Sequence, residues 1–205
     1  MARIILIRHG ETEWNREERF RGRADLALTE LGMRQAGAIA VKLAQWPVAA
    51  IYSSPLRRAM MTAQAQAQHL GVSVEVLPGL ADIDYGKWQG LTPLEASQSF
   101  PESYGRWLEA PHLVQIPGGD SLAQVRERAW RALHDVVAQW RQETVAMVSH
   151  MVVCRLLLCA ALGLDDSHFW QVEQDVGAIN VLETRNELLT VTLINDTCHL
   201  KGVTQ

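Results

Sequence analysis

The stretch IILIRHGETEWN, residues 4–15, decides the fold and points to the site. Its first four residues are apolar and predict a short buried strand. The strand ends directly on Arg8 and His9, and a long polar stretch with turn residues follows. A buried strand that ends on an arginine and a histidine delivers two polar side chains to one place, which indicates a functional site there.

The composition predicts a globular protein with one sizeable core. The 205 residues are 48% hydrophobic and 20% charged, with a net charge of -4. This charge argues against a general binder of nucleic acid or of a membrane surface. No apolar run has the length of a signal peptide or a membrane span, and the cysteines show neither disulfide nor zinc-site spacing. We therefore expect a cytoplasmic protein without a metal, a nucleic-acid partner or a membrane partner.

Helix and strand patterns alternate along the first half of the chain. Thr29 predicts a helix cap. An apolar face at helical spacing follows it: Met33, Ala36, Ala40 and Leu43. AAIYSS (49–54) and VSVEVL (72–77) predict two further strands. Between these strands, Ser54 and Pro55 predict the cap and the first turn of another helix.

The second half repeats the alternation. In PGGDSLAQ (117–124), Ser121 and Gln124 have capping-box spacing, and a long helix with one apolar face follows. TVAMVSH (144–150) predicts a buried strand, and residues 156–162 predict an apolar helix. At the C-terminus, AINVLET and LLTVTLIN, with RNE between them, predict an antiparallel hairpin.

Strands that alternate with helices predict a three-layer α/β/α sandwich with a mostly parallel sheet and one antiparallel edge. The segment 91–119 is rich in Pro, Trp and Ser and predicts a small, partly helical insertion that caps the active site at one end of the sheet. We expect residues 1–205 to form a single domain. The apolar C-terminal edge also allows a homodimer.

Polar residues gather where the predicted parallel strands end, and such sheets bind ligands beyond those carboxyl ends. Arg8 and His9 end the first strand, His150 ends the TVAMV strand, and Arg57 and Arg58 open the helix after the second strand. The first turn of a helix disfavours cations unless an anion sits there. Guanidinium forks beside free backbone N–H groups suit phosphate, so the sequence predicts a phosphate site, with Arg57 facing solvent.

Each of these residues also has an ordinary explanation when it is taken alone. RHG is a short string that arises by chance, and a lone histidine at a strand end is more often structural. The convergence of three strand ends on one anion site favours function over these explanations.

Six motifs resemble those of the histidine phosphatase superfamily, which has the phosphoglycerate-mutase-like fold. In chain order they are RHGETEWN, FRGRADLALTELGMRQA, YSSPLRRAMMTA, LADIDYGKWQG, PGGDS and VSHMVVCRLL. The resemblance implies that His9 is the nucleophile that takes a phosphoryl group, and that Arg8, Arg58 and His150 hold this group. It implies that Asn15 also faces the phosphate. Two arginines and a second histidine can spread the transferred charge without a cofactor.

The general acid and the residue after the second histidine depart from the family pattern. Relatives usually have glutamate where this chain has Asp82, so the resemblance assigns the acid/base role to a side chain one methylene shorter. Asp84 is the competing carboxylate, but an extended segment points it to the opposite face. Met151 stands where relatives commonly have glycine, and it could narrow the pocket.

Five residues are expected to bind substrate: Asn15, Gly22, Arg21, Tyr85 and Met151. Tyr85 could stack on a substrate ring or simply pack in the core. Arg21, with Arg19 and Arg23, could meet the incoming phosphate or remain as solvated loop charges.

The resemblance implies a phosphatase rather than a mutase. The mutase pattern has an arginine directly after the acid, and this chain has Ile83. Between Gly90 and Gly119 the insertion carries one cation, Arg106, whereas mutases have a longer basic insertion. The expected activity is metal-independent hydrolysis of a small phosphorylated metabolite through a phosphohistidine, with α-ribazole 5′-phosphate as the candidate substrate. The alternatives are a cofactor-dependent phosphoglycerate mutase and a non-catalytic phosphate-binding regulatory module.

Overall fold

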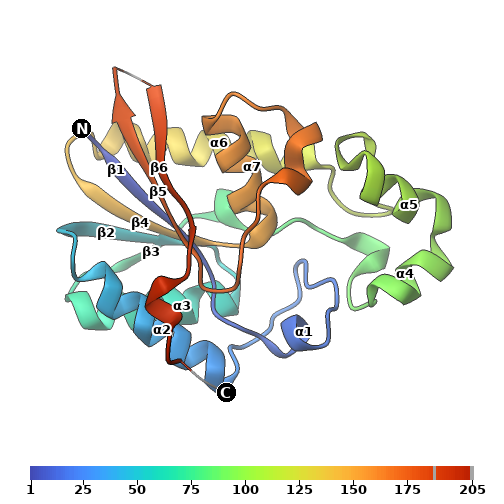
Figure 1. The fold of residues 1–205 in the computed structure, drawn as a ribbon, viewed down its shortest axis with the longest axis horizontal. Helices are drawn as coiled ribbons and strands as arrows, with labels where there is room; N and C mark the ends of the chain where they lie inside the picture. Colours follow the sequence, from blue (N-terminus) through green and yellow to red (C-terminus); the bar gives the residue numbers. More distant parts are fainter. Residues whose placement is uncertain (187, 204–205) are drawn as a thin grey trace.

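The computed structural model describes residues 1–186 and 188–203, which include one mixed sheet. The strand order is β3-β2-β4-β1-β5-β6 (Figure 1). β1 to β4 are parallel, whereas β5 runs antiparallel to both β1 and β6. This confirms the mostly parallel sheet with an antiparallel edge. The strands are β1 (Arg3–Arg8), β2 (Val48–Ser53), β3 (Val74–Val76), β4 (Thr144–Ser149), β5 (Ile179–Arg185) and β6 (Leu188–Asp196).

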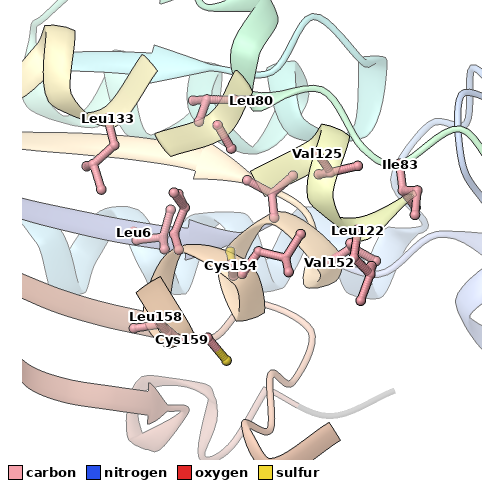
Figure 2. Packing of buried hydrophobic residues seen from close by; sticks show 14 of the residues in the cluster. Leu6, Leu80, Ile83, Leu122, Val125, Leu133, Val152, Cys154, Leu158 and Cys159 are labelled. Carbon is pink, nitrogen blue, oxygen red and sulfur yellow. The ribbon is translucent and has the colours of Figure 1, made fainter. Parts of the chain in front are cut away.

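Four long helices cover the two faces of the sheet and confirm the three layers (Figure 1). β1 explains the arrangement, because its side chains alternate between the faces. Ile5 and Ile7 pack in the cluster that holds α2 and α3, while Ile4 and Leu6 pack in the cluster of α6 and α7. Figure 2 shows part of the second cluster. The helices are α2 (Glu30–Leu43), α3 (Arg57–Leu70), α6 (Leu122–Gln139) and α7 (Met151–Ala161).

Short helices lie beyond the carboxyl ends of the parallel strands (Figure 1). The insertion is partly helical, as expected, with α4 (Pro93–Ser99) and α5 (Pro101–Glu109). Trp107 of α5 joins it to the core, since its ring centroid lies 6.0 Å from that of Trp88. The remaining pieces are α1 (Glu13–Arg16) and 3-10 turns at Pro78–Leu80, Gly86–Trp88, Pro111–Leu113, Asp166–Gln171 and Cys198–Leu200.

No helix within residues 1–186 and 188–203 is long and apolar enough to cross a membrane. The predicted hairpin is confirmed by the pairing of β5 with β6. One residue of its connection, Glu187, lies outside the described residues. The single-domain organisation stays a prediction.

Two helix caps are confirmed and one is wrong. The Thr29 hydroxyl accepts the Gly32 N–H at 3.0 Å, and Ser121 forms its capping box with Gln124. The prediction of a cap at Ser54 is wrong, because α3 begins at Arg57 and Leu56 occupies the cap position. The Ser54 hydroxyl instead lies 2.7 Å from His150 Nε2, so the site uses the group that the sequence suggested for the helix.

The apolar face of α2 is shifted from the predicted one. Ala36, Ala40 and Leu43 are buried, but Met33 is 44% exposed. The reason is the close approach of the loop after β1, where a Cβ on Gly32 would overlap the Glu11 carbonyl. That contact places Gly32 rather than Met33 against the protein. The apolar helix predicted at residues 156–162 begins earlier, at Met151, directly after His150.

Candidate active site

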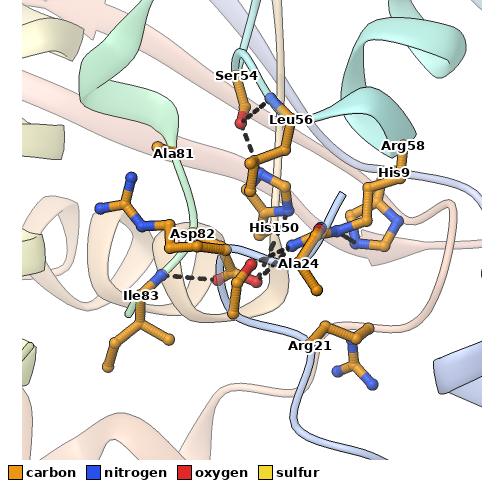
Figure 3. A network of polar contacts seen from close by, with 12 residues as sticks. His9, Arg21, Ala24, Ser54, Leu56, Arg58, Ala81, Asp82, Ile83 and His150 are labelled. Carbon is orange, nitrogen blue, oxygen red and sulfur yellow. Dashed lines mark hydrogen bonds and ion pairs between the residues drawn. The ribbon is translucent and has the colours of Figure 1, made fainter. Parts of the chain in front are cut away.

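The predicted strand ends meet at one place (Figure 3). β1 delivers His9, β4 delivers His150, α3 delivers Arg58, and the loop after β3 delivers Asp82. The two imidazole centroids lie 5.2 Å apart. His9 is 1% exposed and His150 is 0% exposed, so the charges around them act with little screening by water.

His9 is held as a neutral imidazole whose Nε2 is unprotonated. Its Nδ1 lies 2.6 Å from the Gly10 carbonyl oxygen, which can only accept, so Nδ1 carries the proton. Its Nε2 accepts from Arg58 Nε at 3.2 Å. Burial, then Arg58 and Arg8, hold the pKa of His9 well below its ordinary value. Neutral imidazole with an unprotonated Nε2 is the form that can attack phosphorus.

Arg58 connects the other groups of the site. Its Nη2 donates to Asp82 Oδ2 at 2.9 Å and to the Gly22 carbonyl at 2.8 Å, while Nη1 donates to the Ala24 carbonyl at 3.0 Å. The side chain is fully buried, and burial lowers the pKa of the guanidinium. Its neighbour Arg57 is exposed, as the sequence predicts.

Asp82 and Asp84 have different surroundings. Asp82 Oδ1 accepts the Ile83 N–H at 3.0 Å, and Oδ2 lies 3.8 Å from His150 Nδ1 as well as next to Arg58. Asp84 Oδ1 instead accepts the Gly86 N–H at 2.8 Å and closes a turn. Of the two carboxylates, Asp82 is the one that lies beside His150 and Arg58.

Arg128 of α6 clamps the loop that carries Asp82, and sequence reasoning missed it. Its guanidinium donates to the carbonyl oxygens of Gly79 at 2.8 Å, Ala81 at 2.6 Å and Asp82 at 2.9 Å. Nothing in the helical pattern of α6 distinguishes Arg128 from the other cations of that helix. The signal could have come only from knowing which loop packs against it.

The PGGDS turn packs against the same loop from another side. The Asp120 N–H donates to the Asp84 carbonyl at 2.9 Å, and the Asp120 carboxylate accepts the Asp84 N–H at 2.9 Å. A Cβ on Gly119 would overlap that Asp84 carbonyl, so glycine is needed for the approach. The motif therefore supports the Asp82 loop in addition to capping α6.

Arg8 is held by a second group of residues that the sequence did not reveal. Its Nη1 donates to the Gln174 carbonyl. The Gln174 side chain exchanges two hydrogen bonds of 2.8 Å with the Asn180 side chain on β5, and both residues are buried. Burial and then Arg21 lower the pKa of Arg8 to about 9.

A cavity of about 410 Å³ adjoins Arg8 at this end of the sheet. Four of the five expected substrate-binding residues line it: Asn15, Arg21, Tyr85 and Met151. Gly22 does not line it, and its carbonyl holds Arg58 instead. The insertion contributes Pro93 and Trp107. The other lining residues are Glu11, Glu18, Arg19, Phe20, Trp170 and Val176.

The lining residues are themselves held in place. Asn15 Oδ1 accepts from the Thr12 N–H at 3.0 Å and from its hydroxyl at 2.7 Å. Arg21 Nη1 donates to the carbonyls of Trp14 and Arg19. Tyr85 packs with its ring centroid 4.8 Å from that of Phe20, and burial raises its pKa. No group of three or more His, Cys, Asp or Glu among the described residues could hold a metal ion.

Comparisons with known proteins agree with this geometry. The model of the histidine phosphatase superfamily (branch 1) matches residues 4–197. Phosphoserine phosphatase 1 of Hydrogenobacter thermophilus is 38% identical over 98% of this chain and 95% of its own length. The metal-independent phosphoserine phosphatase of Arabidopsis thaliana is 33% identical over 99% of this chain and 85% of its own. The structure of YhfR from Bacillus stearothermophilus superimposes with a TM-score of 0.93 at 31% identity, covering 98% of this chain and 100% of that one.

Proposed function

Because this chain belongs to the histidine phosphatase superfamily and is a phosphomonoester hydrolase, we propose that it hydrolyses a small phosphorylated metabolite through a phosphohistidine on His9. The observation that carries the proposal is the state of His9, whose Nδ1–H donates to the Gly10 carbonyl, so that its Nε2 is the unprotonated nitrogen. Arg58 donates a hydrogen bond to Nε2, and an incoming phosphate can take that guanidinium as its own partner.

The proposed reaction has two steps. First, His9 Nε2 attacks phosphorus, the bond from phosphorus to the ester oxygen breaks, and Asp82 in its acid form protonates the leaving oxygen. Second, Asp82 as carboxylate takes a proton from water, whose oxygen attacks phosphorus and breaks the P–N bond. Arg8, Arg58 and His150 stabilise the charge on the transferred group in both steps.

We propose that no metal takes part. Two buried guanidinium groups already face the site, and they supply the positive charge that a metal ion supplies in other phosphatases. The name of the Arabidopsis relative supports this proposal. Retained activity in the presence of a chelator is the direct test.

The cavity suggests two substrate candidates. Arg19, Arg21, Glu11 and Glu18 all line the cavity, so it offers a substrate both cations and carboxylates. This mixture suits an amino-acid phosphate such as phosphoserine, whose carboxylate and ammonium need opposite partners, and the relatives' names agree. Aromatic rings at Tyr85, Trp107 and Trp170 also suit a ring-bearing ester, and this favours α-ribazole 5′-phosphate as the second candidate.

The experiment is phosphate release from phosphoserine, α-ribazole 5′-phosphate and 3-phosphoglycerate, with a chelator present. His9→Ala is the inactive variant, and His112→Ala, an exposed histidine of the insertion, is its matched control. We expect release by the wild type and by His112→Ala, and none by His9→Ala. Isomerisation of 3-phosphoglycerate without net release would indicate the mutase. Phosphate binding without any turnover would indicate the regulatory module.

A further inference from the structure

Ser54 and His150 form a buried contact that the proposed reaction does not use. Ser54 Oγ lies 2.7 Å from His150 Nε2, and both residues are 0% exposed. Figure 3 shows the Ser54 side chain directed at the ring from the chain segment after β2. Because the contact is buried, water cannot replace either partner, and the direction of the hydrogen bond has to be consistent with every neighbour.

The hydroxyl hydrogen of Ser54 determines that direction, because it needs an acceptor. The Leu56 N–H donates to Ser54 Oγ at 3.3 Å, so the oxygen already accepts one hydrogen bond. A serine hydroxyl has a single hydrogen to donate. Among the described residues, His150 Nε2 is the acceptor in reach of that hydrogen. If Nε2 carried a proton, the Ser54 hydroxyl hydrogen would be left buried without an acceptor, which is unfavourable.

We propose that Ser54 is a positioning residue that holds His150 in the tautomer with its hydrogen on Nδ1, so that a neutral His150 donates to the transferring phosphoryl group. The proposal rests on the proposed function, because it assigns a direction to the phosphoryl contact of His150. Ser54 never touches the substrate and acts only through the imidazole.

The surroundings of the other ring nitrogen, Nδ1, support this assignment. His150 Nδ1 is buried without a hydrogen-bond partner among the described residues, and it lies 3.8 Å from Asp82 Oδ2. A lone pair on Nδ1 would face that carboxylate and the phosphoryl oxygens, all of which are electron-rich. A hydrogen on Nδ1 is attracted by both. Because Ser54 bonds to Nε2, the Nδ1–H of His150 stays available to donate to a phosphate oxygen.

The two histidines are therefore set in complementary ways. In His9 the Nδ1–H donates to the Gly10 carbonyl, so Nε2 is the unprotonated nitrogen. In His150 the Ser54 hydroxyl donates to Nε2, so the hydrogen is on Nδ1 and has no partner yet within the described part of the chain. Burial, then Arg58 and His9, hold the pKa of His150 well below its ordinary value, so the neutral ring is the form present at pH 7. One histidine can then attack while the other donates.

The direct test is nitrogen NMR of the substrate-free protein with ¹⁵N-labelled histidine rings. The His150 signals are identified among the seven histidines by their loss in His150→Gln. We expect a protonated Nδ1 and an unprotonated Nε2, which resonate at clearly different shifts. A protonated Nε2 in the wild type would overturn the proposal without any Ser54 variant, even if phosphatase activity is confirmed. Absence of activity with the expected tautomer would instead count against the proposed function.

Variants test the consequence for the reaction. Ser54→Ala removes the donor, and Ser54→Thr keeps a hydroxyl. Ser53→Ala is the matched control, because its equally buried hydroxyl donates to the Ser54 carbonyl at 2.9 Å and not to the imidazole. We expect Ser54→Ala to mix the tautomers and to lower kcat by about tenfold with little change in KM, which is the pattern of a lost transition-state contact.

We expect Ser54→Thr and Ser53→Ala to keep the wild-type tautomer, and Ser54→Thr to restore kcat. An equal loss of kcat in Ser54→Ala and Ser53→Ala, with unchanged His150 signals, would reduce Ser54 to a packing residue and contradict the proposal. If Ser54→Ala does not fold, the wild-type spectrum still tests the proposal, because a protonated Nε2 would overturn it. The spectrum and kcat of Ser54→Thr then test whether a hydroxyl at this position is sufficient.

Discussion

Arg58 shows how much one side chain contributes to the site. It contacts His9, Asp82 and two backbone carbonyls, those of Gly22 and Ala24, so its planar fork organises parts of the chain that are distant in sequence. Lysine has the same charge but cannot make four such contacts from one rigid plane.

The Arg58→Lys variant should therefore lose most of its activity. We expect kcat/KM to fall on the order of 10²–10³-fold, since this is the usual effect of removing a donor aimed at developing charge. Arg57→Lys, an exposed neighbour on the same helix turn, is the control and should behave as wild type. Steady-state kinetics on the preferred monoester measures both. Because both changes keep the charge, a similar loss in the two variants would show that any change in this helix turn is harmful, and would contradict the role of the Arg58 fork.

Asp82 carries the next prediction, because a general acid matters only when the leaving group needs a proton. Asp82→Asn should lower kcat/KM, which covers the steps up to departure of the leaving group, by roughly 10²–10⁴-fold for an alkyl phosphate, the range typical of general acid catalysis. The loss should be much smaller for p-nitrophenyl phosphate, whose leaving group is stable as an anion. Asp84→Asn is the control, since Asp84 closes a turn instead. Equal losses with both esters would show that Asp82 acts by holding Arg58, and would contradict its role as the general acid.

At the scale of elements, the loop between β3 and α4 depends on α6. Arg128 donates to three carbonyls of that loop, and these bonds orient the backbone on both sides of Asp82. Loops of this kind carry catalytic groups because a rigid element holds them. The residue that positions the proposed acid therefore comes from a part of the chain 46 residues later.

Arg128→Met should loosen the loop and destabilise the protein. A hydrogen bond from a charged donor contributes about 1.5–3 kcal/mol when it is buried. Because the Arg128 side chain is 25% exposed, water screens its three bonds and replaces part of them in the variant. We therefore expect the free energy of unfolding to fall by about 2–3 kcal/mol in total, together with a lower kcat. Arg131→Met on the same helix removes only an exposed ion pair with Glu127 and should change stability by less than about 0.5 kcal/mol. Urea unfolding and kinetics on both variants make the comparison. Equal stability of the two variants would contradict the clamp.

At the scale of the whole molecule, the buried histidines make stability depend on pH. Burial and neighbouring arginines lower the pKa of both His9 and His150 below the ordinary value of 6.5. Below about pH 6.5 these two histidines therefore bind protons in the unfolded chain but not in the folded chain. The free energy of unfolding is unaffected by this protonation above that pH. It decreases as the pH falls, by at most about 1.4 kcal/mol per pH unit for each histidine.

The measurement is the free energy of unfolding in urea between pH 7 and pH 5. His150→Gln removes one of the two groups, and we expect its slope to be smaller by about 1 kcal/mol per pH unit. His69→Gln replaces an exposed histidine of α3 and should keep the wild-type slope. Parallel curves for the wild type and His150→Gln would show that the histidine is already protonated when folded.

The order of strands and helices could be predicted because it rests on local patterns. The apolar run before Arg8, the caps at Thr29 and Ser121 and the C-terminal hairpin depend on residues a few positions apart, and all of them are present. Element ends were less predictable. The cap expected at Ser54 failed because α3 begins only at Arg57, with Leu56 at the cap position, and the Ser54 hydroxyl lies against the distant His150.

The sequence by itself determined the layered fold, the family and the polar residue types at the strand ends. Only the tertiary structure decided what each of those residues contacts. Arg8 is held by a residue 166 positions away, and the loop carbonyl of Asp82 is held by Arg128, 46 positions away. The position of the hydrogen on His150 follows from a distant contact too, with Ser54, 96 positions away, whereas the one on His9 follows from the adjacent Gly10. Hydrophobic periodicity records which face of an element is buried, but a buried polar group acts according to its partner, and the partner is chosen by packing.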